Sequence, residues 1–184
     1  MSTRSQVLFV EKNEYMENGK KVEWTTEAQI YRHSDGYPTA VLPDLKEFFD
    51  WNYGRNCDVS YLAANWIFYE KRKMEEHYDM VKDAYHKKHD YRGAKDNPND
   101  IIKIGYGIEK ADHRIHGDEN WIYRITVNPK GDGIDERYHQ QPVWFVEIAR
   151  VEGDNTTFDN AKYIASGTLE DVVNRSVEIE QSVY

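Results

Sequence analysis

The dipeptide Asn18-Gly19 restricts the fold of this chain more than any other feature, because it stands between two segments with strand character. Asn-Gly supplies the two positive φ angles of a type I′ turn, which joins antiparallel strands tightly. After it, apolar and polar residues alternate from Val22 to Ile30, so this strand is predicted to have one buried face and one wet face. Before it, Val7 to Val10 is continuously apolar and predicts a central strand covered on both faces.

Three later segments have helical spacing. The first helix is predicted to begin near Pro43 and to end near Gly54, with the apolar residues Leu42, Leu45, Phe48 and Phe49 on one side. Asp58 is placed to cap a second helix, whose apolar stripe is Val59, Leu62, Ala63, Trp66 and Tyr69. The sequence Thr168-Leu169-Glu170-Asp171 resembles a helix capping box, with Asp where Glu is usual. It predicts a terminal helix with Leu169, Val172, Val173 and Val177 on its apolar side.

Three further strands are predicted from alternating or continuous apolar runs, over residues 102–108, 121–127 and 143–148. Short connections favour antiparallel neighbours in a meander. We therefore expect a single α+β domain over residues 1–184, with an antiparallel sheet of about five strands, two central helices and a C-terminal helix. Its 184 residues are a common size for one domain, and no Pro/Gly/Ser-rich stretch divides them.

Composition restricts the classes of partner. The 33 acidic residues exceed the 24 basic ones, which disfavours direct binding to nucleic acid. The single cysteine, Cys57, cannot form an intramolecular disulfide, and no apolar run approaches the roughly 20 residues of a membrane span. We expect a cytoplasmic protein without a membrane interaction. For the 14 Tyr and 5 Trp, core packing is the favoured interpretation, and a stacked ligand or a protein interface is the alternative.

The turn Tyr31-Arg32-His33-Ser34-Asp35-Gly36-Tyr37-Pro38 offers the first candidate site. Arg32 could bind a phosphate or carboxylate while stacking on Tyr31 or Tyr37, and the alternative is an ion pair with a nearby carboxylate. Asp35 could orient His33 as a general base. The alternative for Asp35 and Gly36 is turn building, in which Gly36 takes a backbone conformation closed to other residues.

Two His-x-x-His pairs form the second candidate, His86/His89 and His113/His116, with carboxylates beside them. Four imidazoles could hold a tetrahedral zinc ion, and the alternative is that all four are solvated. Phosphate-loop, dinucleotide, nucleophile-elbow and His-Glu-x-x-His motifs are missing from the sequence. No cofactor is expected.

The segment from Ala28 to Pro38 resembles a family of small, largely uncharacterised proteins of bacteriophages and other prokaryotic viruses. In that family an apolar strand leads to Tyr-Arg-[His/Gln]-x-Asp-Gly-Tyr-Pro. Looser similarities are the opening Ser2-Thr3-Arg4, the stretch Leu62-Ala63-Ala64, and residues 117–123. The chain departs from the pattern in a longer first hairpin, a charged helix after Tyr69 and a polar loop over residues 86–100. The resemblance implies a viral origin and supplies no catalytic residues.

The leading expectation is a non-catalytic viral accessory protein that binds a host defence protein or a small nucleotide-like immune signal. Its expected ligand contacts are Tyr31, Arg32, His33, Asp35 and Tyr37, with Tyr91 and Arg92 as a lid. One alternative is a metal-assisted hydrolase or nuclease that uses the histidine pairs. Another is an acidic inhibitor that imitates nucleic acid. A homo-oligomer is compatible with all three.

Overall fold

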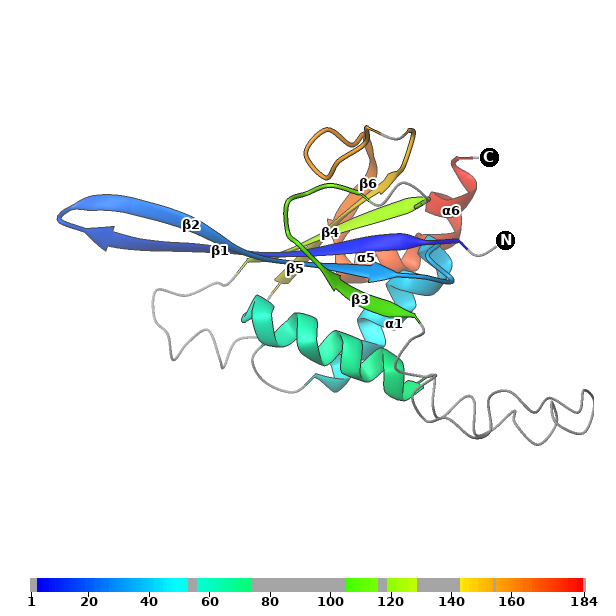
Figure 1. The fold of residues 1–184 in the computed structure, drawn as a ribbon, viewed down its shortest axis with the longest axis horizontal. Helices are drawn as coiled ribbons and strands as arrows, with labels where there is room; N and C mark the ends of the chain where they lie inside the picture. Colours follow the sequence, from blue (N-terminus) through cyan, green and yellow to red (C-terminus); the bar gives the residue numbers. More distant parts are fainter. Residues whose placement is uncertain are drawn as a thin grey trace, which may run out of the picture.

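The computed structural model describes residues 3–52, 56–73, 105–115, 119–128, 143–153 and 155–183. They form an α+β fold with one open, mixed sheet of six strands in the order β3-β2-β1-β4-β5-β6 (Figure 1). The strands are β1 (Ser5–Glu17), β2 (Lys20–Arg32), β3 (Tyr106–Glu109), β4 (Trp121–Asn128), β5 (Val143–Arg150) and β6 (Tyr163–Thr168). None of the helices in the described part of the chain is long and apolar enough to cross a bilayer.

The predicted hairpin is confirmed. β1 and β2 pair antiparallel from Ser5↔Arg32 to Glu17↔Lys20, which leaves a two-residue turn. Asn18 and Gly19 have φ angles of 50° and 77°, as a type I′ turn requires. The apolar run at Val7 also lies where it was expected, since β1 has strand neighbours on both sides and its residues 5–10 are buried.

The prediction of a purely antiparallel meander is wrong at the centre of the sheet. β4 lies parallel to β1, from Ser5↔Trp121 to Glu11↔Val127, whereas every other neighbouring pair is antiparallel. The chain leaves β2, forms two helices and β3, and then returns on the other side of β1. A return over so many residues allows the parallel direction, which a short hairpin does not. The sixth strand, β6, was not predicted from the sequence.

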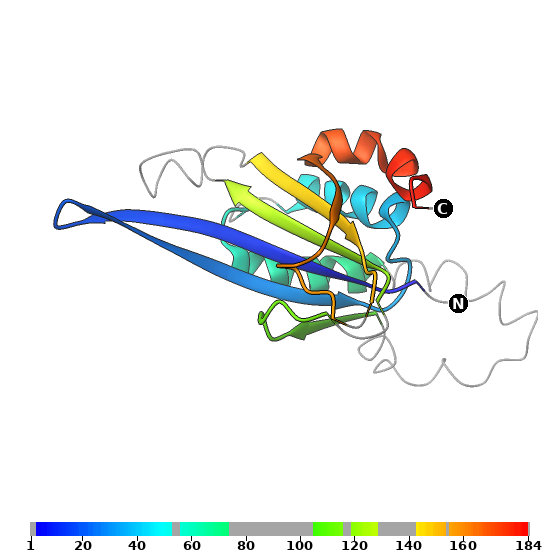
Figure 2. The ribbon, with the colours of Figure 1, turned by 90° about the horizontal axis from the view of Figure 1, so that it is seen from above.

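The helices lie on one face of the sheet (Figures 1 and 2). α1 (Pro38–Trp51) begins five residues before the predicted Pro43, with Pro38 in the first turn, where a missing N–H costs nothing. The next helix covers residues 59–73, and Asp58 caps it as predicted, because its Oδ1 lies 3.5 Å from the backbone nitrogen of Tyr61. Together these helices bury the larger apolar cluster, which includes Val7, Phe9, Ile30, Leu42, Phe48, Leu62 and Trp66.

The C-terminal helix is divided into α5 (Leu169–Asn174) and α6 (Ser176–Gln181). Thr168 caps α5 as predicted, with its Oγ1 accepting from the Asp171 backbone N–H at 3.3 Å. The buried positions of the two helices are Leu169, Val172, Ser176 and Ile179, so the prediction that Val177 lies on the apolar side is wrong: Val177 is 58% exposed. The opposite face of the sheet carries a smaller apolar cluster of Leu8, Val10, Ile122, Ala149 and Phe158.

The distal half of the β1–β2 hairpin projects beyond the rest of the sheet as an arm (Figures 1 and 2). We define the arm as residues 12–25, since β4 pairs with β1 over residues 5–11 and β3 pairs with β2 over residues 29–32. The predicted burial of one strand face therefore holds for Ile30, which is fully buried, and is wrong for Trp24, which is 45% exposed. The alternation continues into the arm, but the core beneath it does not.

Candidate functional site

The predicted turn residues divide between the two faces of the sheet. Tyr31 and Arg32 are adjacent on β2, so their side chains point to opposite faces. Arg32 is 6% exposed on the helix-covered face, and its Nη1 lies 2.8 Å from the Asp44 carboxylate. Arg32 and Asp44 therefore form an ion pair. Arg32 Nε also donates to the Ser34 carbonyl at 2.9 Å. This geometry favours the ion-pair alternative for Arg32, and its role as a ligand contact stays a prediction.

The other turn residues form two surface pairs. The Tyr31 hydroxyl and His33 Nδ1 lie 2.8 Å apart, and the Tyr37 hydroxyl donates to Asp35 Oδ1 at 3.3 Å. The negative charge of Asp35 raises the pKa of Tyr37. Asp35 therefore contacts Tyr37, and His33 contacts Tyr31, so the structure does not place Asp35 as the partner that orients His33. Ligand binding by these four residues stays a prediction.

Asp35 and Gly36 lie in the turn between β2 and α1, but the backbone conformation predicted for Gly36 is wrong. The residue with positive φ is Asp35, at 53°, and not Gly36 as the sequence suggested. Gly36 is required for a different reason: a Cβ on it would lie 2.6 Å from the Arg4 carbonyl carbon. Its N–H donates to the Thr3 carbonyl at 2.9 Å, and its carbonyl accepts from the buried Tyr123 hydroxyl at 2.9 Å. The turn is thus fixed between the N-terminal segment and β4.

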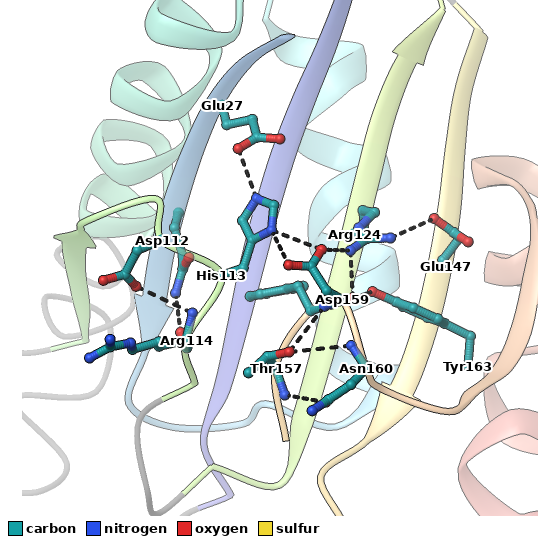
Figure 3. Close-up of polar contacts among 12 residues, drawn as sticks. Glu27, Asp112, His113, Arg114, Arg124, Glu147, Thr157, Asp159, Asn160 and Tyr163 are labelled. Carbon is teal, nitrogen blue, oxygen red and sulfur yellow. Dashed lines mark hydrogen bonds and ion pairs between the residues drawn. The ribbon is translucent and has the colours of Figure 1, made fainter. Parts of the chain in front are cut away.

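Five of the predicted residues lie outside the described residues: His86, His89, Tyr91, Arg92 and His116. The remaining member of the histidine pairs, His113, lies in a charged network on the face opposite the helices (Figure 3). Its φ of 62° is in the left-handed region. Among the residues described, no group of three or more His, Cys, Asp or Glu side chains has a geometry that could hold a metal ion.

Both nitrogens of the His113 ring contact carboxylates. Nε2 lies 2.8 Å from Glu27 on β2, and Nδ1 lies 2.8 Å from Asp159 in the segment before β6 (Figure 3). Partial burial of the ring acts to lower the pKa of His113, but the hydrogen bonds to Asp159 and Glu27 outweigh it and raise this pKa. An imidazole donates from both nitrogens when it is protonated, so this arrangement favours the cationic form.

Arg124 on β4 extends the network along the same face of the sheet, toward β5 and β6. Its Nη2 lies 3.4 Å from Asp159, its Nη1 lies 3.9 Å from Glu147, and its guanidinium lies 5.2 Å from the centre of the Tyr163 ring. Burial raises the pKa of Tyr163 to about 12, so the phenol is protonated and donates to the Phe158 carbonyl at 2.7 Å. The network therefore holds residues 110–115 and 155–163 against the open face.

A second charged cluster lies on the helix-covered face and was missed in the sequence. Asp44 on α1 accepts from Lys73 at 2.8 Å as well as pairing with Arg32, and Lys73 also reaches Glu47 at 2.7 Å. Glu70, 4% exposed, accepts from the Tyr106 hydroxyl at 2.8 Å. The sequence does indicate that Glu70 is buried, because Glu70 follows Trp66 by four residues and so falls on the apolar stripe of its helix.

The arm carries exposed apolar side chains on one face. The pairs Tyr15↔Val22 and Asn13↔Trp24 share the face of Phe9 and Ile30, which is the face the helices cover farther along the sheet. Tyr15 and Trp24 are 47% and 45% exposed, and their rings meet edge to face with centroids 5.5 Å apart. The other face carries charged side chains together with the exposed Met16, and Lys21 there lies 2.6 Å from both Glu14 and Glu23. The arm is therefore amphipathic.

A pocket of about 340 Å³ lies between α1, β5 and the start of α5. Its wall includes the stacked rings of Phe49 and Trp144, 3.9 Å apart, and the ion pair of Lys46 with Asp50 at 3.0 Å. None of the ligand-contact or metal-site residues predicted from the sequence lines it. Protein-family models, curated protein sequences and solved structures gave no match to this chain.

Proposed function

We propose that this chain is a non-catalytic viral accessory protein that binds a host defence protein, and that the arm is its contact surface. The viral origin is supported by the resemblance of residues 28–38 to proteins of prokaryotic viruses. The binding role is supported above all by one observation: a long hairpin leaves the sheet and presents Tyr15 and Trp24 to solvent.

An arm of this kind has little stability of its own unless a partner contacts it. A two-stranded hairpin is marginally stable in water, and its outer edges present unpaired backbone groups. Exposed Tyr and Trp are the side chains that most often contribute large binding energies at protein interfaces. On the opposite face, Lys21 and its two carboxylate partners resist nonspecific strand pairing. The arm is thus suited to an interface formed through its apolar face.

The charged clusters support binding rather than catalysis. Arg32 is paired with Asp44, and His113 is held between two carboxylates. Each of these side chains is committed to a contact that positions another segment of the chain. A substrate would have to displace that contact before either residue could act on it.

The test is co-purification from cells of the native host, with the arm variant Tyr15→Ser/Trp24→Ser beside the wild type. We expect the wild type to retain a host protein, identified by mass spectrometry, and the arm variant to lose it. Phe68→Ser is the matched control, because it removes an aromatic side chain that is 59% exposed on the helix of residues 59–73. Equal retention by the arm variant, or equal loss by the control, would contradict the proposal.

A small nucleotide-like ligand is the second candidate, and the pocket beside α1 favours it. The stacked rings of Phe49 and Trp144 could contact a base, and Lys46 could contact a phosphate. Calorimetry with a panel of cyclic and ADP-ribose-type nucleotides would test it. We expect Lys46→Ala to weaken any binding at least tenfold, while Lys21→Ala on the arm leaves it unchanged. Absence of binding to the wild type would remove this candidate.

A further inference from the structure

Glu70 lies where a carboxylate is expensive. It is 4% exposed and lies on the helix that includes residues 59–73, on the same side as Trp66. An ionised carboxyl group loses most of its hydration in such a place, and this loss must be offset by hydrogen bonds and cations. The contacts of Glu70 show how much of this lost hydration is replaced by hydrogen bonds and cations.

Among the described residues, the carboxyl group of Glu70 has one hydrogen-bond donor. The Tyr106 hydroxyl donates to Oε2 at 2.8 Å, and Oε1 is buried without a hydrogen-bond partner in this part of the chain. The charged and titratable groups that face Glu70 are Arg32 from β2, Tyr106 from β3, Asp44 from α1 and Lys73 from its own helix.

The two cations near Glu70 are already paired with another carboxylate. Arg32 and Lys73 each lie 2.8 Å from Asp44, one on each carboxylate oxygen. Lys73 also lies 2.7 Å from Glu47. The negative charge of Asp44 opposes ionisation of Glu70. Burial and then Asp44 raise the pKa of Glu70 to about 7, against the opposing effects of Arg32, the Tyr106 hydrogen bond and Lys73.

We propose that Glu70 is a protonation latch: the neutral carboxyl group keeps residues 70–73 of this helix against β3 and α1, and ionisation releases these residues. The first turns of the helix stay in place, because Asp58 caps them and Leu62 and Trp66 are fully buried in the core. Release separates Lys73 from Asp44 and Glu47, carries Glu70 toward water, where the charged carboxylate is solvated, and leaves Arg32 paired with Asp44. The latch does not depend on the identity of any partner.

Hydrogen exchange of the wild type between pH 6 and pH 8 tests the latch. After correction for the intrinsic pH dependence of exchange, we expect protection of the amides of residues 67–73 to fall about tenfold across this range. Protection in α1 should not change. In Glu70→Gln, which stays neutral at every pH, the protection of residues 67–73 should be independent of pH.

Glu47→Gln is the matched control, since Glu47 belongs to the same cluster but its side chain is 60% exposed. It should keep the pH dependence of the wild type. A wild-type profile without pH dependence, or the same dependence in Glu70→Gln, would overturn the proposal.

A second measurement does not require the Glu70→Gln variant to fold. Carboxyl carbon NMR of the wild type reports the titration of each glutamate directly. A Glu70 midpoint near 7, accompanied by the loss of amide protection, supports the latch. A midpoint near the ordinary glutamate value of 4.5 would show that the group is solvated and would overturn it.

Discussion

The two faces of the sheet each carry a charged network, and the networks differ in how far water reaches them. On the helix-covered face, Arg32 and Glu70 are 6% and 4% exposed. On the open face, the side chains of His113 and Asp159 are 24% and 66% exposed. Both networks hold a segment outside the central strands against the sheet. Their responses to pH have the same sign but different causes. Burial opposes charge on Glu70 and raises its pKa, whereas paired carboxylates favour charge on His113 and raise its pKa, so both networks lose stability as pH rises.

The largest expected effect comes from Arg32→Met. Removal of the guanidinium leaves the partly buried Asp44 with one cation and leaves Glu70 with a more negative neighbour. Breaking a buried ion pair by removing one partner costs about 3–5 kcal/mol of unfolding free energy. Urea denaturation at pH 7 measures it. A loss below about 1 kcal/mol would show that Arg32 is not structural and would restore it as a ligand contact.

The next effect is a dependence of stability on pH. Because the folded pKa of Glu70 is about 7 and its ordinary value is 4.5, the unfolded chain releases this proton first as pH rises. The contribution of Glu70 to stability therefore falls between about pH 4.5 and pH 7 and is constant above, at a cost on the order of 3 kcal/mol. Glu70→Gln should match the wild type at pH 4 and exceed it by about this amount at pH 8. Equal stability of the two proteins at pH 8 would contradict this.

A smaller change in stability is expected for His113→Asn, which removes a stabilising contact. Asn tolerates the left-handed backbone of this position, so the change tests the ring contacts rather than the φ of 62°. We expect a loss of about 1 kcal/mol at pH 5.5, given the partial exposure of the contacts. Because the folded pKa is raised above 6.5, the stabilisation is complete below pH 6.5 and disappears as pH rises through the folded pKa. A loss that grows with pH would contradict the assignment.

The smallest expected effect is the coupling between the faces. Within the described ranges Arg32 and His113 share no partner, so the losses in the double variant Arg32→Met/His113→Asn should add within about 0.5 kcal/mol. Denaturation of the two single variants and the double variant under one condition completes this cycle. A coupling above about 1 kcal/mol would mean that the sheet transmits strain between its faces.

The features predicted from the sequence are those that neighbouring residues determine. Asn18-Gly19 specifies its turn through backbone conformation, and Asp58 and Thr168 cap helices within three residues of themselves. The alternation up to Ile30 predicted a strand, but it could not show that the core ends before Trp24. Core burial depends on which strands lie beside β2, and the sequence of β2 does not contain that information.

The charged networks depend on pairs that lie far apart in the chain. His113 and Asp159 are separated by 46 positions, and Glu70 and Tyr106 by 36. The parallel pairing of β1 with β4 also depends on residues far apart in the chain, since either strand direction satisfies the apolar pattern of Val7 to Val10. For Glu70, however, a carboxylate on the apolar stripe was visible in the sequence as a local conflict. Such conflicts indicate functional or strained positions.

The arm has a further consequence for how this protein can change. Its strands pair with each other from Lys12↔Thr25 to Glu17↔Lys20, in a register fixed by the two-residue turn. Deletion or insertion of two residues in each strand preserves that register and keeps the same side chains on the same face. The length of the arm can therefore change independently of the rest of the fold, by natural or engineered mutation, in steps of about 7 Å.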